Sequence, residues 1–263
     1  MAELEPRLAA HADALWEAEA KRAPIAPLTE TDPGLTVAEA YAIQSRNVTR
    51  RIEAGAAVLG RKIGLTSKAM QAQLGVTEPD FGCLLTGMAH EEGEDISSAE
   101  LLQPRVESEI AFLLGRDLEG PNVTAVEALT AIDAGLPALE IIDSRIADWK
   151  IGLADTVADN ASSARYVLGA RLTPVRDLDL RLLGVVLTVN GAVVETGAGA
   201  AVLGNPARCV AWLANKLAEF GETLEAGDVV LAGAVHRSAP VTAGDSVRAE
   251  FARLGSVTTR FVQ

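Results

Sequence analysis

The most informative stretch of the chain is Pro104-Arg105-Val106-Glu107-Ser108-Glu109-Ile110-Ala111-Phe112. Its apolar residues predict a β-strand, in which Glu107 and Glu109 point to the same face because they are two residues apart. Two carboxylates on one face repel each other unless solvent or a cation lies between them. Clusters of carboxylate oxygens are typical sites for Mg²⁺, Mn²⁺ or Ca²⁺. These residues alone are consistent with either a solvated surface or a metal site.

A third carboxylate lies in an apolar segment further along the chain. Glu140 is embedded in Leu136-Pro137-Ala138-Leu139-Glu140-Ile141-Ile142. A charge in such surroundings is costly unless it is paired or coordinated. An ion pair with Arg145 or Arg105 is one explanation. The other is that Glu107, Glu109 and Glu140 together bind one divalent metal, Mg²⁺ or Mn²⁺.

Three further polar residues stand where chemistry is expected. Lys62 lies among apolar residues and glycines in Gly60-Arg61-Lys62-Ile63-Gly64-Leu65-Thr66, and glycine there permits close approach of a ligand. A buried lysine could bind a substrate carboxylate or transfer protons. The alternative is a strand lysine whose ammonium group reaches solvent. Asp80 and Asp159 occur in turn-type clusters, and by themselves they would be ordinary caps.

Sequence patterns predict a helical region at residues 1–57. Apolar residues recur every three or four positions over residues 4–21, as in an amphipathic helix. Thr36 followed by Glu39 is a capping box for a second helix, which closes at Gly55.

Residues 58–263 are predicted to form a catalytic β-rich domain, so the fold class is α+β. Short apolar runs broken by Gly, Pro and Asp are typical of strands. Two helices are expected to interrupt them, at residues 123–134 and 206–220. The turns at 226–228 and 243–245 each precede a strand that we expect to be antiparallel.

The composition excludes several classes of protein. With 263 residues, of which 49% are hydrophobic and 22% charged, the chain has the make-up of a globular protein. Its formal net charge of −13 opposes binding to nucleic acid or to an anionic membrane surface. No apolar run is long enough to span a bilayer and no signal peptide is recognisable, so we expect a cytoplasmic protein. Cys83 and Cys209 lie far apart, and we expect both to be core residues.

Two common catalytic motifs are incomplete. Residues 196–200, Thr-Gly-Ala-Gly-Ala, lack the spacing and the Lys-Ser/Thr ending of a phosphate-binding loop. The histidines, His11, His90 and His236, occur in unrelated contexts and do not support a Ser-His-Asp triad.

Five short motifs, taken in order along the chain, form a familiar combination. They are Gly60-Arg61-Lys62-Ile63-Gly64-Leu65-Thr66-Ser67, Glu78-Pro79-Asp80-Phe81-Gly82, Pro104-Arg105-Val106-Glu107-Ser108-Glu109, Ala138-Leu139-Glu140-Ile141-Ile142-Asp143-Ser144-Arg145 and Asp155-Thr156-Val157-Ala158-Asp159-Asn160-Ala161-Ser162. Together they resemble the 2-keto-4-pentenoate hydratase family, the hydratase and decarboxylase branch of the fumarylacetoacetate hydrolase superfamily. The resemblance runs from about Leu28 to Phe261 and includes Gly255-Ser256-Val257 near the end.

The resemblance implies a fold and a set of site residues. The fold is a fumarylacetoacetate hydrolase-like mixed β-sheet roll with a small helical N-terminal region. The implied site residues are Glu107, Glu109 and Glu140 for the metal, Lys62, Asp80 and Asp159 for catalysis, and Lys62, Leu65 and Ser162 for the substrate. Homo-oligomers, and association with a partner enzyme of the same pathway, are expected on the same basis.

The activity that the resemblance implies is a metal-dependent hydro-lyase reaction in the meta-cleavage breakdown of aromatic compounds. The substrate would be 2-hydroxypenta-2,4-dienoate or a close homologue. Protonation at carbon 5 would give an unsaturated 2-oxo acid, and water would then add at carbon 4 to give 4-hydroxy-2-oxopentanoate. We expect Lys62 or Asp80 to transfer the proton and Asp159 to position water or substrate.

Three other functions share much of this pattern. They are 4-oxalocrotonate decarboxylase, 2-oxohept-4-ene-1,7-dioate hydratase and a non-catalytic partner subunit of such an enzyme. Asp148-Trp149-Lys150-Ile151 is similar to pentenoate hydratases, whereas Ala161-Ser162-Ser163-Ala164-Arg165 is also similar to decarboxylases. We therefore expect a hydratase and keep the decarboxylase as the alternative.

Overall fold

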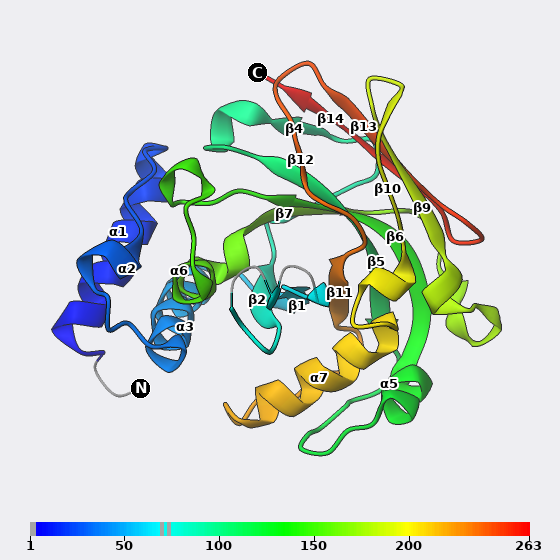
Figure 1. The fold of residues 1–263 in the computed structure, drawn as a ribbon, viewed down its shortest axis with the longest axis horizontal. Helices are drawn as coiled ribbons and strands as arrows, with labels where there is room; N and C mark the ends of the chain where they lie inside the picture. The colour runs from blue at the N-terminus through cyan, green and yellow to red at the C-terminus, as the bar shows by residue number, and fades with distance from the viewer. Residues whose placement is uncertain (1–3, 69–70, 73–74) are drawn as a thin grey trace.

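The computed structural model of the chain describes residues 4–68, 71–72 and 75–263. Its N-terminal side consists of the helices α1 (Pro6–Lys21), α2 (Leu28–Thr31) and α3 (Val37–Glu53), which lie together on one flank of the molecule (Figure 1). The hydroxyl of Thr36 accepts from the N–H of Glu39, and the Glu39 carboxylate accepts from the N–H of Thr36. This capping box satisfies N–H groups that the helix leaves free. Both long helices predicted in this region are confirmed.

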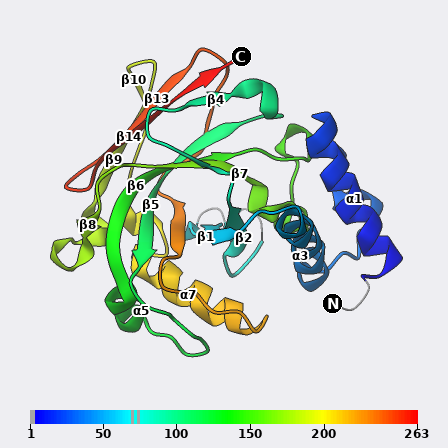
Figure 2. The same cartoon turned by 180° about the vertical axis from the view of Figure 1, so that it is seen from behind.

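The centre of the described molecule is a nine-stranded mixed sheet with the order β2-β1-β11-β5-β6-β7-β3, to which β12 adds beside β5 and β8 beside β6. Its strands are β1 (Val58–Gly64), β2 (Asp80–Leu85), β3 (Ala89–His90), β5 (Arg105–Leu114), β6 (Ile132–Ile142), β7 (Ser163–Leu168), β8 (Thr173–Pro174), β11 (Val229–Ala234) and β12 (Ala239–Pro240). The antiparallel pair β5 and β6 is long and curves around the middle of the molecule (Figures 1 and 2). The α+β fold with a mixed sheet is therefore confirmed.

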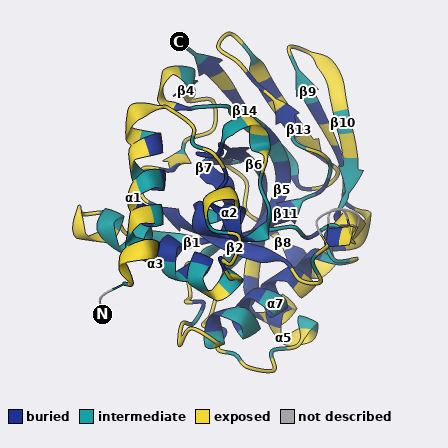
Figure 3. Ribbon diagram, turned by 60° about the vertical axis from the view of Figure 1, so that its left-hand side comes forward, coloured by how far each residue is buried: buried dark blue, intermediate teal, exposed yellow. Residues whose placement is uncertain are grey.

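A second sheet has the order β10-β9-β13-β14-β4. Its strands are β4 (Asp95–Ser97), β9 (Gly184–Val189), β10 (Ala192–Ala198), β13 (Ser246–Phe251) and β14 (Gly255–Val262). Along β13, buried and exposed residues alternate, as expected for a sheet with one face on the core and one in water. Figure 3 shows that β10, at the rim of this sheet, is largely exposed.

Further α-helices among the described residues are α5 (Ala125–Ala131), α6 (Leu153–Ala158) and α7 (Pro206–Ala218). In α7 the Asn205 side chain accepts from the N–H of Ala207, as its cap sequence predicts. The helix predicted at 123–134 is correct only as far as Ala131. Its last three residues, from Ile132, belong to β6, because Ile132 pairs with Leu114 of β5 and this pairing overrides local helix preference.

The predicted turns lie where expected, but one strand pairs differently. Residues 226–228 precede β11, and residues 243–245 precede β13. β13 is antiparallel to both of its neighbours, whereas β11 is antiparallel to β5 and parallel to β1. The expectation of an antiparallel strand is thus wrong for one side of β11.

One large cluster of buried apolar side chains joins the helical region to both sheets. It includes Leu8 of α1, Ile43 of α3, Phe112 of β5 and Phe261 of β14. The division of the chain at residue 57 stays a prediction. Cys83 and Cys209 are buried free thiols. Within the described ranges, no helix has the length and hydropathy needed to cross a membrane.

Candidate metal centre and active site

Cross-strand register brings the predicted polar residues to one face of the nine-stranded sheet. Glu107 of β5 lies opposite Glu140 of β6. Glu109 is two residues further along β5, so its side chain points to the same face. Lys62 reaches the site from β1, because β1 pairs with β11 and β11 pairs with β5. Residues that are remote in sequence are therefore close in space.

The three glutamates form a compact cluster of oxygen atoms. One carboxylate oxygen from each of Glu107, Glu109 and Glu140 lies within 4.8 Å of the other two. Glu109 and Glu140 are fully buried, and Glu107 is half-buried. The solvated-face interpretation is therefore wrong for Glu109. Glu109 Oε2 accepts from the N–H of Gly233 at 2.8 Å.

Several oxygens of this cluster lack a hydrogen-bond donor. They are Glu109 Oε1 and both carboxylate oxygens of Glu140, judged against the part of the chain that the structure describes; of the three, Glu140 Oε2 has an ion-pair partner, Lys62. Buried polar atoms without a partner are rare and costly in folded proteins. Divalent cations such as Mg²⁺ and Mn²⁺ bind carboxylate oxygens of this kind. The buried oxygens without a donor therefore indicate that the three glutamates fit the expected metal.

Lys62 is the cation that the structure places beside the cluster. Its side chain is buried, and Nζ lies 3.2 Å from Glu140 Oε2 and donates to the Ala161 carbonyl at 3.1 Å. The alternative interpretation, in which the ammonium group of Lys62 reaches solvent, is therefore excluded. Among the described residues, the ion pair of Glu140 is formed with Lys62 rather than with Arg145 or Arg105.

Burial and mutual repulsion raise the pKa values of the acids. Burial raises the pKa of Glu107 to about 7, although Lys62 opposes this. Burial and the neighbouring Glu140 raise the pKa of Glu109 well above its ordinary value. Burial alone would lower the pKa of Lys62, but the surrounding carboxylates outweigh it and raise that pKa. Acids that hold protons in this way would release them when a cation binds.

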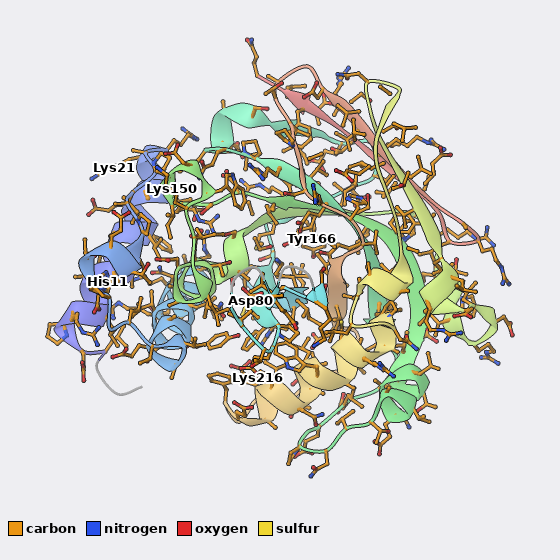
Figure 4. All side chains as sticks on the ribbon, viewed as in Figure 1. His11, Lys21, Asp80, Lys150, Tyr166 and Lys216 are labelled. Atoms are coloured by element: carbon orange, nitrogen blue, oxygen red, sulfur yellow. The ribbon has the colours of Figure 1, made fainter. Side chains whose placement is uncertain are left out.

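Asp80 lies at the start of β2, opposite Gly64 of β1. Its carboxyl is buried, and Oδ1 has no hydrogen-bond partner within the described ranges. A Cβ atom at Gly64 would lie 2.1 Å from this oxygen, so a side chain at position 64 would displace the Asp80 carboxyl. Burial raises the pKa of Asp80, and Lys62 opposes this. Figure 4 labels Asp80 in the middle of the molecule, beside β1 and β2. A buried acid that keeps its proton can donate one.

Asp159 makes its contacts with a neighbouring turn rather than with the glutamates. Its Oδ1 accepts from Arg145 Nε, and its Oδ2 accepts from the Arg145 N–H at 3.0 Å. The hydroxyls of Ser144 and Ser162 also donate to Oδ2, at 3.3 and 3.4 Å. Burial raises the pKa of Asp159 to about 6, and Arg145 opposes this. Both carboxylate oxygens of Asp159 thus accept hydrogen bonds from Arg145. These contacts do not support the prediction that Asp159 positions water or substrate directly.

The turn beside Asp159 presents a carbonyl group to Lys62. Asn160, Ala161 and Ser162 have φ values of 53°, 50° and 53°. This left-handed conformation costs about 1–2 kcal/mol for each non-glycine residue, so it persists only where contacts hold it. The Asn160 side chain accepts from the Cys83 N–H at 2.8 Å and donates to the Cys83 carbonyl at 3.0 Å. The turn thereby holds the Ala161 carbonyl in place for Lys62.

A cavity of about 660 Å³ opens beside Glu107. Leu65 lies in its wall, whereas Ser162 is not part of the lining and its hydroxyl faces Asp159. The structure therefore brings Leu65, but not Ser162, to the cavity. Direct substrate contacts by these two residues stay predictions.

Gly233 belongs to the site but was not identified from sequence. Its N–H donates to Glu109, and its φ of +112° suits glycine alone. A Cβ atom there would lie 2.3 Å from the Thr66 hydroxyl oxygen. The one signal in the sequence is a glycine inside the apolar strand Val229–Ala234, which commonly marks a bulge or a close backbone approach.

The chain also matches a known family over most of its length. The model of the fumarylacetoacetate (FAA) hydrolase C-terminal family matches residues 56–262. The chain belongs to the fumarylacetoacetate hydrolase family. The matched region contains all three glutamates, Lys62, Asp80 and Asp159.

Similar members of the fumarylacetoacetate hydrolase family include hydratases and a decarboxylase. A 2-keto-4-pentenoate hydratase of Paraburkholderia xenovorans LB400 is 50% identical over 250 residues, which cover 95% of this chain and 93% of the relative. A 2-oxo-hept-4-ene-1,7-dioate hydratase of Escherichia coli is 41% identical over 257 residues, covering 95% and 96%. The solved 4-oxalocrotonate decarboxylase of Pseudomonas putida G7, complexed with magnesium and adipate, is 40% identical with a TM-score of 0.94, covering 100% of this chain and 99% of its own.

Proposed function

We propose that this protein is a metal-dependent hydratase that adds water to 2-hydroxypenta-2,4-dienoate, or a close homologue, to give 4-hydroxy-2-oxopentanoate. The observation that carries the proposal is the buried cluster of Glu107, Glu109 and Glu140 with its unpartnered oxygens beside Lys62. The identity of 50% to a 2-keto-4-pentenoate hydratase supports the substrate.

In this proposal the three glutamates hold Mg²⁺ or Mn²⁺. When bound, the cation supplies positive charge that polarises the 2-oxo acid and stabilises enolate character. Magnesium in the related decarboxylase supports the choice of a divalent metal. The partly accessible Glu107 faces the cavity, so the substrate reaches the cluster from that side.

Lys62 and Asp80 are assigned to binding and proton transfer. The Lys62 ammonium is held between Glu140 and the Ala161 carbonyl, where it can attract a substrate oxygen that gains negative charge. We assign proton donation to carbon 5 to Asp80, because burial raises the pKa of its carboxyl and one of its oxygens has no hydrogen-bond partner among the described residues.

Asp159 is assigned a different role from the one expected from sequence. Through Arg145 it holds the turn whose Ala161 carbonyl accepts from Lys62, so it acts as a positioning residue. The predicted contact with water or substrate is not part of this proposal.

The test is a product analysis on the purified protein with Mg²⁺. Loss of the dienoate ultraviolet absorbance should accompany formation of a product heavier by one water, and 4-oxalocrotonate should yield little CO₂. Rapid CO₂ release with no hydration would establish the decarboxylase instead. Metal binding without turnover of either substrate would support the non-catalytic subunit.

The remaining expectations are proposals as well. Cytoplasmic location is an expectation from the sequence, whereas homo-oligomer formation and association with a partner enzyme of the same pathway rest on the family resemblance. Sedimentation analysis of the purified protein, alone and mixed with a candidate decarboxylase, would test the last two.

A further inference from the structure

Two arginines line the cavity without a carboxylate partner. Arg105 and Arg237 both belong to its wall, and neither forms an ion pair with any of the described residues. By contrast, the buried Arg61 and Arg145 are paired with Glu222 and Asp159. In a chain with a net charge of −13, cations that stay unpaired beside a cavity are available to an anionic ligand.

The two arginines line the same cavity as Glu107 and come from neighbouring parts of the sheet. Arg105 precedes Glu107 by two residues on the same face of β5, a separation of about 6.6 Å along the strand. Its guanidinium lies 5.0 Å from the centre of the Trp149 ring, a contact that restrains the side chain. β12 pairs with the start of β5, with Pro240 opposite Arg105, and this pairing brings the preceding loop close.

That loop, residues 235–238, carries Arg237. The His236 ring nitrogen Nδ1 lies 2.7 Å from the Arg237 carbonyl, which braces the loop from within. The Ser238 side chain also belongs to the cavity wall and can add a hydroxyl donor. The cavity volume of about 660 Å³ falls in the range of sites for much larger ligands than a pentadienoate.

We propose that Arg105 and Arg237 form a subsite for a second carboxylate at the tail of the substrate. The inference rests on the proposed function, which places the 2-oxo acid head at the glutamate cluster. Guanidinium groups bind carboxylates through paired N–H donors, so a tail that ends in a carboxylate is recognised better than one that ends in a methyl or methylene group. The enzyme therefore also hydrates 2-hydroxydienoates with a terminal carboxylate.

The binding test uses two 2-oxo acids that share a head and cannot be hydrated. With Mg²⁺ present, calorimetry should show that 2-oxoadipate binds about tenfold more tightly than 2-oxohexanoate. The double variant Arg105→Gln/Arg237→Gln should lose this preference and keep its affinity for 2-oxohexanoate. Arg237→Gln alone, at an exposed residue, should lose part of the preference even if the double variant folds poorly. Arg176→Gln, an exposed arginine outside the cavity wall, is the matched control and should keep it.

Three results would overturn the subsite. They are equal affinities for the two acids in the wild type, an unchanged preference in the variants, and equal weakening of both acids, which would place the arginines at the head. A kinetic comparison separates this inference from the proposed function. If neither 2-hydroxypenta-2,4-dienoate nor 2-hydroxyhepta-2,4-diene-1,7-dioate is hydrated, the proposed function fails, while the calorimetry still decides the subsite. If only the pentadienoate is hydrated, the subsite fails alone.

Discussion

Replacement of Glu109 by Gln should have opposite effects with and without metal. Any two of the three clustered oxygens lie within 4.8 Å, where two ionised carboxylates repel by about 3.5 kcal/mol at an effective dielectric constant of about 20. Burial raises the pKa of the Glu109 carboxyl, and repulsion by its two neighbours, Glu140 and Glu107, adds to that effect. The amide of Gln keeps an oxygen that can accept from the Gly233 N–H.

The sign of the effect without metal follows from these raised pKa values. A carboxyl whose pKa is higher in the folded state than in the unfolded state contributes stability at low pH, and loses it as the pH rises through the folded value. Gln does not ionise, so the variant escapes this loss. In EDTA, we expect Glu109→Gln to match the wild type below about pH 4, where the carboxyl is protonated in both states, and to unfold at an increasingly higher temperature than the wild type as the pH rises above the unfolded pKa of about 4.3.

Magnesium should reverse that order. At a concentration one hundred times its Kd, Mg²⁺ would stabilise the wild type by about 2.7 kcal/mol, which for a chain of this size raises the Tm by about 5–10 °C. The variant, lacking one of three anionic ligands, should show no such shift and no turnover. Thermal melts with and without Mg²⁺ measure both effects, and Glu53→Gln, an exposed residue of α3, is the control. A normal Mg²⁺ shift in folded Glu109→Gln would refute the reasoning.

Further predictions concern the residues around the cluster. Lys62→Met should lower kcat at least about 100-fold while the protein stays folded with Mg²⁺. Steady-state kinetics measures this, and an unchanged kcat would show that the lysine is not required. Asp159→Asn leaves the buried Arg145 without its ion-pair partner. Calorimetry should therefore show that the free energy of unfolding falls by about 3 kcal/mol, and kcat should fall as well. Lost activity at an unchanged Tm would instead indicate that Asp159 takes part directly in catalysis. Because burial raises the pKa of Glu107 to about 7, Mg²⁺ affinity should weaken about tenfold for each pH unit below 7 when one proton must be displaced, and a pH-independent Kd would contradict this.

Much of the candidate site could be predicted because local sequence carries strong constraints there. Period-two spacing placed Glu107 and Glu109 on one face, and the apolar surroundings of Glu140 demanded a partner. The capping box at Thr36 is also a local signal, and the structure contains it.

What could not be predicted depends on contacts between distant segments. The role of Asp159 follows from Arg145, which reaches it across a turn, and sequence spacing does not reveal that pairing. The helix that begins at Ala125 ends early because Ile132 is needed opposite Leu114. Gly233 contributes only a backbone N–H, so no side-chain pattern identifies it.

The central claim is that three glutamates bind one divalent cation on which hydration depends. The most direct test strips the purified protein of metal with EDTA, removes the chelator, and follows turnover of 2-hydroxypenta-2,4-dienoate together with bound metal during a Mg²⁺ titration. We predict no turnover at the start and full turnover at one Mg²⁺ per chain. Full activity in the stripped protein, or turnover that rises without any bound metal, would contradict the account.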